Sequence, residues 1–173
     1  FEVKTRNYTQ VFRENMSIVE PPVIKGKKLK GVQIRFTPDL SKFKTTLEEY
    51  KTLIVKLFEA RVYDLVPTTE ERVKISLNGK QLKTKTLAHY VSLYGDSKPM
   101  IDLESEHWRV AVIPADKFSA IGFVNGIQCS DGPHVTHVTN QIVDGLSDIK
   151  KFSGKNVKNL IKNHLLIFEL VVN

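Results

Sequence analysis

A run of lysines near the carboxyl end of the chain carries the clearest chemical signal in the sequence. The window 149–168 contains no Asp or Glu. Unopposed ammonium groups create a local positive field, and Gly154 allows the backbone to approach a phosphodiester chain closely. The pattern favours contact with duplex DNA through phosphates, without reading of base sequence. The alternative is a solvated cluster that stabilises a helix C-terminus. The lysines are Lys150, Lys151, Lys155, Lys158 and Lys162.

No catalytic residue is expected in this chain. The stretch 153–155 resembles the end of a phosphate-binding loop but lacks its upstream glycine and strand. Cys129, His134 and His137 lie close together in the sequence. Without a further ligand pair elsewhere, they are more typical of a buried cysteine and two surface histidines than of a metal site. We therefore expect no metal site.

Composition indicates a globular protein with an anionic partner. The 173 residues are 41% apolar and 26% charged, and 26 Lys and Arg against 19 Asp and Glu give a net charge of +7. The excess is moderate, and on charge alone a merely soluble basic domain is the more typical interpretation. The single cysteine excludes an intrachain disulfide. The apolar runs are too short to span a bilayer, so we expect no membrane segment. Because the chain begins at Phe1 without a Met, we expect it to be a piece of a longer polypeptide without a signal peptide.

The first third of the chain has the pattern of a sheet followed by a helix. Alternation predicts strands over 1–6, 8–16 and 31–36, with the basic segment 25–30 as a solvated hairpin or loop. A capping box at Thr45 or Thr46 with Glu48 or Glu49 predicts the start of a helix that ends at Pro67. We place a domain boundary there, giving domains 1–66 and 67–173.

The remainder of the chain mixes strands and helices. Asn78-Gly79 between short strands predicts a hairpin. The order of elements predicts a layered α+β sheet with helices on one face. The expected strands are 73–77, 80–82, 108–113, 119–129 and 165–172, and the expected helices begin at Leu87, at about His137 (running through Ile149) and at Asn156 (to His164).

The stretch from Phe123 to the helix at Gln141-Ile142-Val143 resembles the transducer domain of type IIA DNA topoisomerases, closest to the eukaryotic topoisomerase II branch. Motif order and spacing are similar over nearly the whole chain. The resemblance implies the end of a GHKL (Bergerat) ATPase sheet in 1–66. It implies a ribosomal-protein-like β-α-β transducer with a left-handed crossover in 67–173, incomplete at its C-terminus. Its motif residues are Phe123, Val124, Asn125, Gly132 and His134, and its other matching stretches are 36–43, 61–65, 77–82 and 162–168.

The resemblance implies part of an ATP-dependent type II topoisomerase, which passes one duplex through a transient double-strand break in another. This segment would couple ATP-driven closure of the N-terminal gate of a homodimer to the DNA gate. The family's DNA-contacting loop matches Lys150, Lys151 and Lys155, although Phe152 interrupts the run. ATP and Mg²⁺ would belong to the parent enzyme, with their ligands outside these residues, so the chain alone should be inactive and bind neither. The location would be the nucleus, or host cytoplasm or nucleus for a viral enzyme.

Two other readings stay open. Another GHKL ATPase, such as a mismatch-repair or chaperone relative, shares the pair of domains. A stand-alone basic nucleic-acid-binding domain would instead have a closed sheet within residues 1–66. The topoisomerase reading predicts strands in that region that are left without partners.

Overall fold

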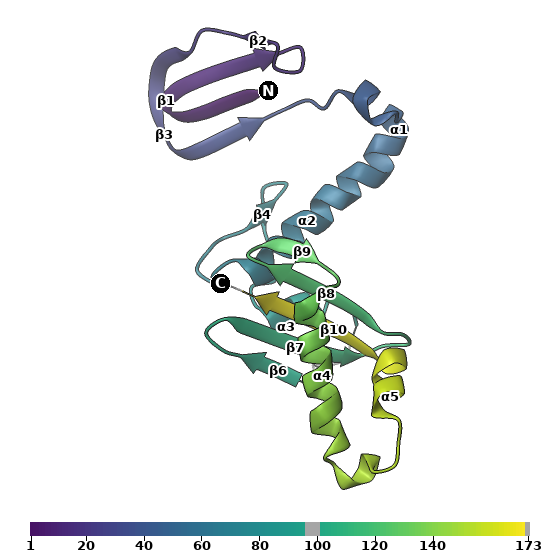
Figure 1. Ribbon diagram of the computed structural model, residues 1–173. Helices are drawn as coiled ribbons and strands as arrows, with labels where there is room; N and C mark the ends of the chain where they lie inside the picture. The colour runs from purple at the N-terminus through teal and green to yellow at the C-terminus, as the bar shows by residue number, and fades with distance from the viewer. Residues whose placement is uncertain (96–100, 172–173) are drawn as a thin grey trace. The chain divides into compact units, whose positions relative to one another are not determined.

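A computed structural model describes residues 1–95 and 101–171 of the chain (Figure 1). The chain forms two compact units, Phe1–Lys56 and Leu57–Asn173. The helix α2 (Val55–Thr68) starts at the end of the first unit and continues in the second. The division between the units therefore falls within this helix, earlier in the chain than the boundary expected at 66/67.

The first unit contains a three-stranded antiparallel sheet in the order β2-β1-β3. The basic segment 25–30 lies inside β3, so the prediction of a loop there is wrong. Its backbone pairs with β1, where Arg6 is opposite Leu29 and Tyr8 is opposite Ile24. The pairing of β1 with β3 shifts its register on both sides of Arg6, so the extra residues of β3 are accommodated as bulges. The density of lysines in 25–30 suggested a loop but carries no information about this pairing. The strands are β1 (Glu2–Arg13), β2 (Ile18–Val19) and β3 (Val23–Arg35).

This sheet does not enclose a core of its own. Among residues 1–56, no side chain whose burial the structure describes is buried. Apolar side chains along β3 are exposed instead: Ile24 by 65%, Val32 by 67% and Ile34 by 59%. The closed sheet required by a stand-alone domain is therefore absent from the described part of this unit, as the topoisomerase reading predicted.

The helix after the sheet begins at the predicted cap. Thr46 accepts the backbone N–H of Glu49, and the Glu49 carboxylate accepts the backbone N–H of Thr46. These hydrogen bonds to the carboxylate hold the pKa of Glu49 below its usual value. After η1 (Leu40–Phe43), the helix proceeds through α1 (Leu47–Glu49), a π-helical turn η2 (Tyr50–Ile54) and α2, which accommodates Pro67 in its last turn.

The second unit is built on a five-stranded sheet in the order β6-β7-β10-β8-β9. The last strand β10 lies between β7, to which it is antiparallel, and β8, to which it is parallel. The connection from β8 to β10 passes through α4 and α5 and forms the expected left-handed crossover (Figure 1). The strands are β6 (Ile101–Glu104), β7 (Trp108–Pro114), β8 (Ser119–Val124), β9 (Ile127–Cys129) and β10 (Leu165–Val171).

The single strand expected over 119–129 is two strands joined by a tight turn. Asn125 and Gly126 have φ values of 49° and 80°, so both central turn residues lie in the left-handed region. Two consecutive positive φ values are typical of the type I′ turn that closes a β-hairpin. The antiparallel pairing of Phe123 with Gln128 and of Val124 with Ile127 follows from this turn.

The helix α4 begins at Pro133 rather than near His137 and ends at Ser147. Proline is favoured in the first turn of a helix because its missing N–H would have no intrahelical partner there. Gly132 precedes it with a φ of 128°. A short 3₁₀ turn, η3 (Lys150–Phe152), leads to α5 (Val157–His164), which agrees with the helix predicted from about Asn156 and has Asn156 as its N-cap.

Helices cover both faces of this sheet, so the prediction of helices on one face is wrong. Successive strand residues point to opposite faces. In β7, Val110 and Val112 pack with Val138 of α4 and Ile161 of α5, whereas Ala111 and Ile113 pack with the other core cluster. That other cluster includes Val66 of α2 and residues of α3 (Leu87–Val91).

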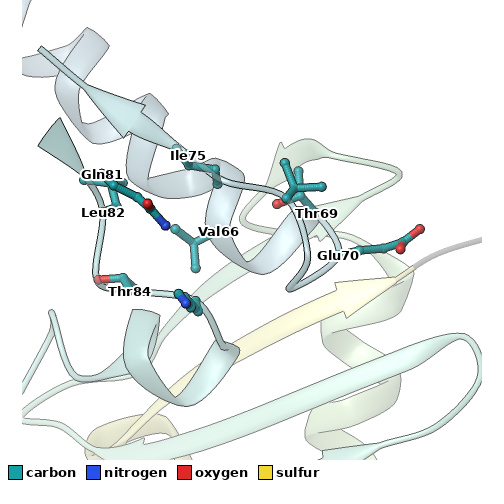
Figure 2. Close-up of a pocket in the computed structure, with 9 residues that line it drawn as sticks. Val66, Thr69, Glu70, Ile75, Gln81, Leu82 and Thr84 are labelled. Atoms are coloured by element: carbon teal, nitrogen blue, oxygen red, sulfur yellow. The ribbon is translucent and has the colours of Figure 1, made fainter. Parts of the chain in front are cut away.

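The hairpin of β4 (Ser76–Leu77) and β5 (Lys80–Gln81) has the predicted Asn78-Gly79 turn and lies over the end of α2. Figure 2 shows Val66, Ile75 and Leu82 around a small pocket with polar side chains at its rim. Its volume of about 10 Å³ is room for at most one water molecule. No helix in the described residues is long and apolar enough to cross a membrane.

Candidate nucleic-acid interface

The predicted lysines lie on the connection between α4 and α5 and on α5 itself, which together we call the basic tip (residues 150–162). Lys150 and Lys151 lie in η3, Lys155 lies in the following turn, and Lys158 and Lys162 lie in α5. All five are exposed. Because α4 has 15 residues, the tip lies about 22 Å along the helix from the β8–β9 hairpin. Three of the five lysines therefore lie between the two helices, whereas Lys162 lies near the other end of α5, where its carbonyl accepts the N–H of Phe118 at 3.1 Å.

Apolar side chains fix the tip to the body of the unit. Phe152, which interrupts the lysine run, is partly buried against the core cluster under α4 and α5. Val157 and Ile161 of α5 are 4% and 1% exposed and belong to the same cluster. The Lys155 Nζ atom lies 6.0 Å from the centroid of the Phe152 ring. Phe152 therefore anchors the tip while its neighbours keep their ammonium groups in solvent.

Backbone hydrogen bonds give the tip a defined shape. The N–H of Phe152 donates to the carbonyl of Ile149 at 2.8 Å, and the N–H of Lys155 donates to the carbonyl of Phe152 at 2.9 Å. Gly154 lies between them with a φ of 75°. The Asn156 side chain accepts the N–H of Asn159 at 3.1 Å and caps α5. Lys150, Lys151 and Lys155 therefore project from a hydrogen-bonded turn, and Lys158 and Lys162 project from α5.

The positive charge of the tip is not neutralised within the described residues. None of its five lysines forms an ion pair with a carboxylate of residues 1–95 or 101–171. By contrast, Lys51 pairs with Glu48 and Arg109 pairs with Glu104. An exposed set of cations without internal partners is suited to bind a polyanion and release its counterions.

The predicted motif residues hold the sheet and α4 together and do not form a ligand site. Phe123 is 2% exposed in the core shared with α3, and Val124 pairs with Val171 at the end of β8. Asn125 forms the turn, and its N–H donates to the carbonyl of Val171 at 2.9 Å. Gly132 precedes α4, and His134 lies in its first turn.

The first turn of α4 lies directly against β8. A Cβ atom added to Gly122 would lie 2.4 Å from the carbonyl oxygen of Cys129 and 3.2 Å from Nε2 of His134. Only glycine allows that approach. The ring of His137 packs against that of Trp108, with the two centroids 5.8 Å apart. Cys129 is partly exposed rather than buried.

Two pockets of the second unit are unsuited to a nucleotide. The described residues contain no group of three His, Cys, Asp or Glu side chains that could hold a metal. The pocket of Figure 2 is too small for a nucleotide. A wider groove of about 290 Å³ between β6 and α4 has an almost wholly apolar lining, with Gln141 as its one polar side chain. No lysine or arginine lines this groove, so it has no side chain that could neutralise the phosphates of a nucleotide.

Sequence reasoning missed a polar network on the other face of the sheet. Arg61 and Asp64 of α2, Tyr90 of α3 and Gln128 of β9 are joined by hydrogen bonds. The spacing of Arg61 and Asp64, three residues apart on a helix, could have indicated their ion pair. Their partners are 26 and 67 residues away in the chain, and no local pattern points to them.

The chain is similar in sequence to eukaryotic DNA topoisomerases 2. It is 35% identical to the enzyme of Saccharomyces cerevisiae over 94% of the chain and 34% identical to that of Arabidopsis thaliana over 95%. It is also 39% identical to human DNA topoisomerase 2-alpha over 78% of the chain. The chain spans between 10% and 13% of the length of these relatives. No family model matches the sequence.

Solved structures show the same relationship. The ATPase region of Saccharomyces cerevisiae topoisomerase II superposes with a TM-score of 0.79 and 31% identity, over 98% of this chain and 47% of that one. The ATPase and transducer domains of topoisomerase II from Balamuthia mandrillaris superpose with a TM-score of 0.73 and 25% identity, over 96% of this chain and 49% of that one. With the left-handed crossover and the basic tip, these matches show that the chain belongs to the DNA topoisomerase II family, in the part that covers the end of the ATPase sheet and the transducer.

Proposed function

We propose that the chain is a segment of an ATP-dependent type II DNA topoisomerase that passes one duplex through a transient double-strand break in another. In that enzyme, a homodimer, the segment couples ATP-driven closure of the N-terminal gate to the DNA gate. The proposal is supported by the family membership and by the second unit, which has its own core and a basic tip.

One observation carries the DNA-binding part of this proposal. Four exposed lysines lack carboxylate partners in the described residues: Lys150, Lys151 and Lys155 lie between the two helices, and Lys158 lies in the first turn of α5. Each lysine that approaches a phosphate releases condensed counterions, so affinity comes from the DNA backbone and depends steeply on salt. The expected contact holds duplex DNA without selecting a sequence.

The same proposal assigns the nucleotide chemistry to other parts of the enzyme. The matched Saccharomyces cerevisiae structures are of the ATPase region of topoisomerase II, and we propose that the enzyme uses ATP together with Mg²⁺. We propose that the ligands of both lie outside this segment, whose own contribution is mechanical and electrostatic. For a cellular eukaryotic enzyme the location is the nucleus, and for a viral one it is the host nucleus or cytoplasm.

The test is charge reversal at the tip in the full-length enzyme. We expect the triple variant Lys150→Glu, Lys151→Glu and Lys155→Glu to bind duplex DNA more weakly. The slope of log affinity against log salt should become shallower by about 3, at about 0.9 for each lost phosphate contact. The ratio of ATP hydrolysis with DNA to hydrolysis without DNA should fall as well. Salt titrations of DNA binding and a coupled hydrolysis assay measure the two effects.

A matched control changes the same charge elsewhere. Lys74, Lys80 and Lys83 are exposed and lie near the β4–β5 hairpin, away from the tip in sequence. Their replacement by Glu should leave the salt slope within about 1 of the wild-type value. Equal changes in the two triple variants would refute a specific role for the tip. Equal loss of hydrolysis with and without DNA would assign the tip a structural role instead.

A further inference from the structure

A buried carboxylate ties α2 to the sheet. Asp64 is 9% exposed, and its Oδ1 accepts the hydroxyl of Tyr90 at 2.7 Å. Its Oδ2 accepts Nη1 of Arg61 at 3.0 Å. A buried carboxylate is tolerated when its oxygens are hydrogen-bonded, and here each oxygen has a donor. Asp64 and Tyr90 therefore fix one point of α2 on α3.

Tyr90 extends this attachment to the central strands. It is 1% exposed, and its ring meets those of Phe123 in β8 and Phe168 in β10 edge-on, with centroids 6.1 Å apart in each case. Burial raises the pKa of Tyr90 above its usual value, so the hydroxyl remains a donor at neutral pH. A movement of α2 at Asp64 is thus resisted by the middle of the sheet.

Arg61 adds a second point of attachment one helical turn earlier. Its Nη1 also donates to Oε1 of Gln128 in β9 at 3.0 Å. The Arg61 side chain is 46% exposed, and Gln128 is exposed. An exposed bond of this kind contributes little to stability, but it fixes the direction of a side chain on the helix. Two attachments on successive turns define the rotation of α2 about its own axis, whereas Asp64 alone does not.

We infer that Arg61 and Gln128 form a latch that makes Arg61 a positioning residue for communication between the ATPase end of the chain and the DNA-contacting tip. This inference rests on the function proposed above. The helix α2 starts at the end of the first unit and runs into the second, where it carries Arg61. The strand β9 leads through Gly132 directly into α4, whose far end bears the tip. The latch is the hydrogen bond that joins these two paths.

The test is a double-mutant cycle in the full-length enzyme with the variants Arg61→Ala, Gln128→Ala and both together. We expect each single variant to lose about fivefold or more in DNA-stimulated ATP hydrolysis and strand passage, with hydrolysis in the absence of DNA unchanged. The double variant should be no worse than Arg61→Ala, since both lack the bond to Gln128 and the bond from Arg61 to Asp64. Gln128→Glu, which supplies a charged acceptor to Arg61, should retain wild-type stimulation.

The control is Arg72→Ala. Arg72 is an exposed arginine in the same unit whose Nε lies 2.6 Å from the Glu70 carboxylate, with no partner across the sheet among the described residues. It should keep wild-type stimulation. Additive losses in the double variant, or full stimulation in Arg61→Ala, would overturn the latch. Failure of the proposed function would appear instead in the wild-type enzyme, as an absence of DNA-stimulated hydrolysis and of strand passage.

Discussion

The two faces of the five-stranded sheet each involve one buried carboxylate, and the surroundings of the two carboxylates are opposite. On the face covered by α2 and α3, Asp64 has a donor for each oxygen. On the other face, Glu169 of β10 is 1% exposed, and neither of its oxygens has a hydrogen-bond partner among the described residues. Alternation along β10 places Glu169 with Ile167, on the side of α4 and α5.

The difference indicates that the faces serve different purposes. Directional hydrogen bonds on the first face hold α2 in one orientation, which a relay of motion requires. The second face holds α4 and α5 by apolar contacts between residues such as Val112, Val138 and Ile161. Such contacts stabilise without specifying an angle as strictly. An uncompensated carboxylate on that face reduces stability, so packing there is not optimised for stability alone.

The largest effect should come from removing the satisfied carboxylate. Asp64→Ala takes an acceptor from the buried Tyr90 hydroxyl and the ionic partner from Arg61. We expect the free energy of unfolding to fall by about 2 to 4 kcal/mol. Urea denaturation of the chain, followed by the fluorescence of its single tryptophan Trp108 in β7, measures this change.

Glu70→Ala is the control for that experiment, because Glu70 is an exposed carboxylate that also pairs with an arginine, Arg72. Its removal should change the free energy of unfolding by less than about 0.5 kcal/mol. If Asp64→Ala were equally mild, the face of α2 and α3 would not depend on its polar network. The contrast between the two faces would then be lost.

The second effect should have the opposite sign. Glu169→Met replaces the unpartnered carboxylate by an apolar side chain of similar length, and we expect it to raise the free energy of unfolding by about 1 kcal/mol at pH 8. Burial raises the pKa of Glu169 to about 7, and the charge of His134 opposes that rise. The carboxyl group is therefore protonated in the folded chain at pH values where it is already ionised in the unfolded chain.

The raised pKa of Glu169 makes the stability of the folded chain depend on pH. Its contribution to the free energy of unfolding is complete below the ordinary pKa of Glu, 4.5, and is lost as the pH rises through about 7. From pH 6 to pH 8 the wild-type chain should lose about 1 kcal/mol relative to Glu169→Met. Glu104→Gln, on the exposed edge strand, should follow the wild-type curve. Parallel curves for wild type and Glu169→Met would mean that Glu169 is ionised in the folded chain throughout.

Local signals predicted local structure well. The capping box at Thr46, the Asn78-Gly79 hairpin and the start of α5 near Asn156 are each specified by residues within a few positions of one another. The Arg61–Gln128 and Asp64–Tyr90 bonds join separate elements, and only the folded sheet reveals them. Strand alternation likewise shows that two faces exist but not that different helices cover them.

The missed turn at Asn125-Gly126 has a different cause. The alternation of apolar residues continues from Phe123 to Ile127 across the turn, and this continuity suggested one long strand. The Asn-Gly pair carries the same conformational signal as Asn78-Gly79, with φ values of 49° at Asn125 and 51° at Asn78. Turn chemistry should therefore outweigh alternation wherever Asn-Gly interrupts an apparent strand.

The smallest effect should arise at this turn, and it links the hairpin to the latch. Asn125→Leu places a side chain with a poor preference for positive φ in the turn, and we expect it to lower the free energy of unfolding by about 1 kcal/mol. Asn125→Gly should be nearly neutral because glycine adopts that φ freely. Thermal unfolding followed by Trp108 fluorescence distinguishes the two variants. Asn78→Leu, in the matching turn of the β4–β5 hairpin, is the control for turn strain alone.

Only the Asn125 turn sets the position of Gln128, which is paired with Phe123 two residues before the turn. Asn125→Leu should therefore also weaken DNA-stimulated hydrolysis in the full-length enzyme, whereas Asn78→Leu should lose a similar amount of stability without that loss. If the two leucine variants had the same activity as well as the same stability, the β8–β9 hairpin would be a simple edge of the sheet. Its hydrogen bond to α2 would then belong to the fold and not to the relay.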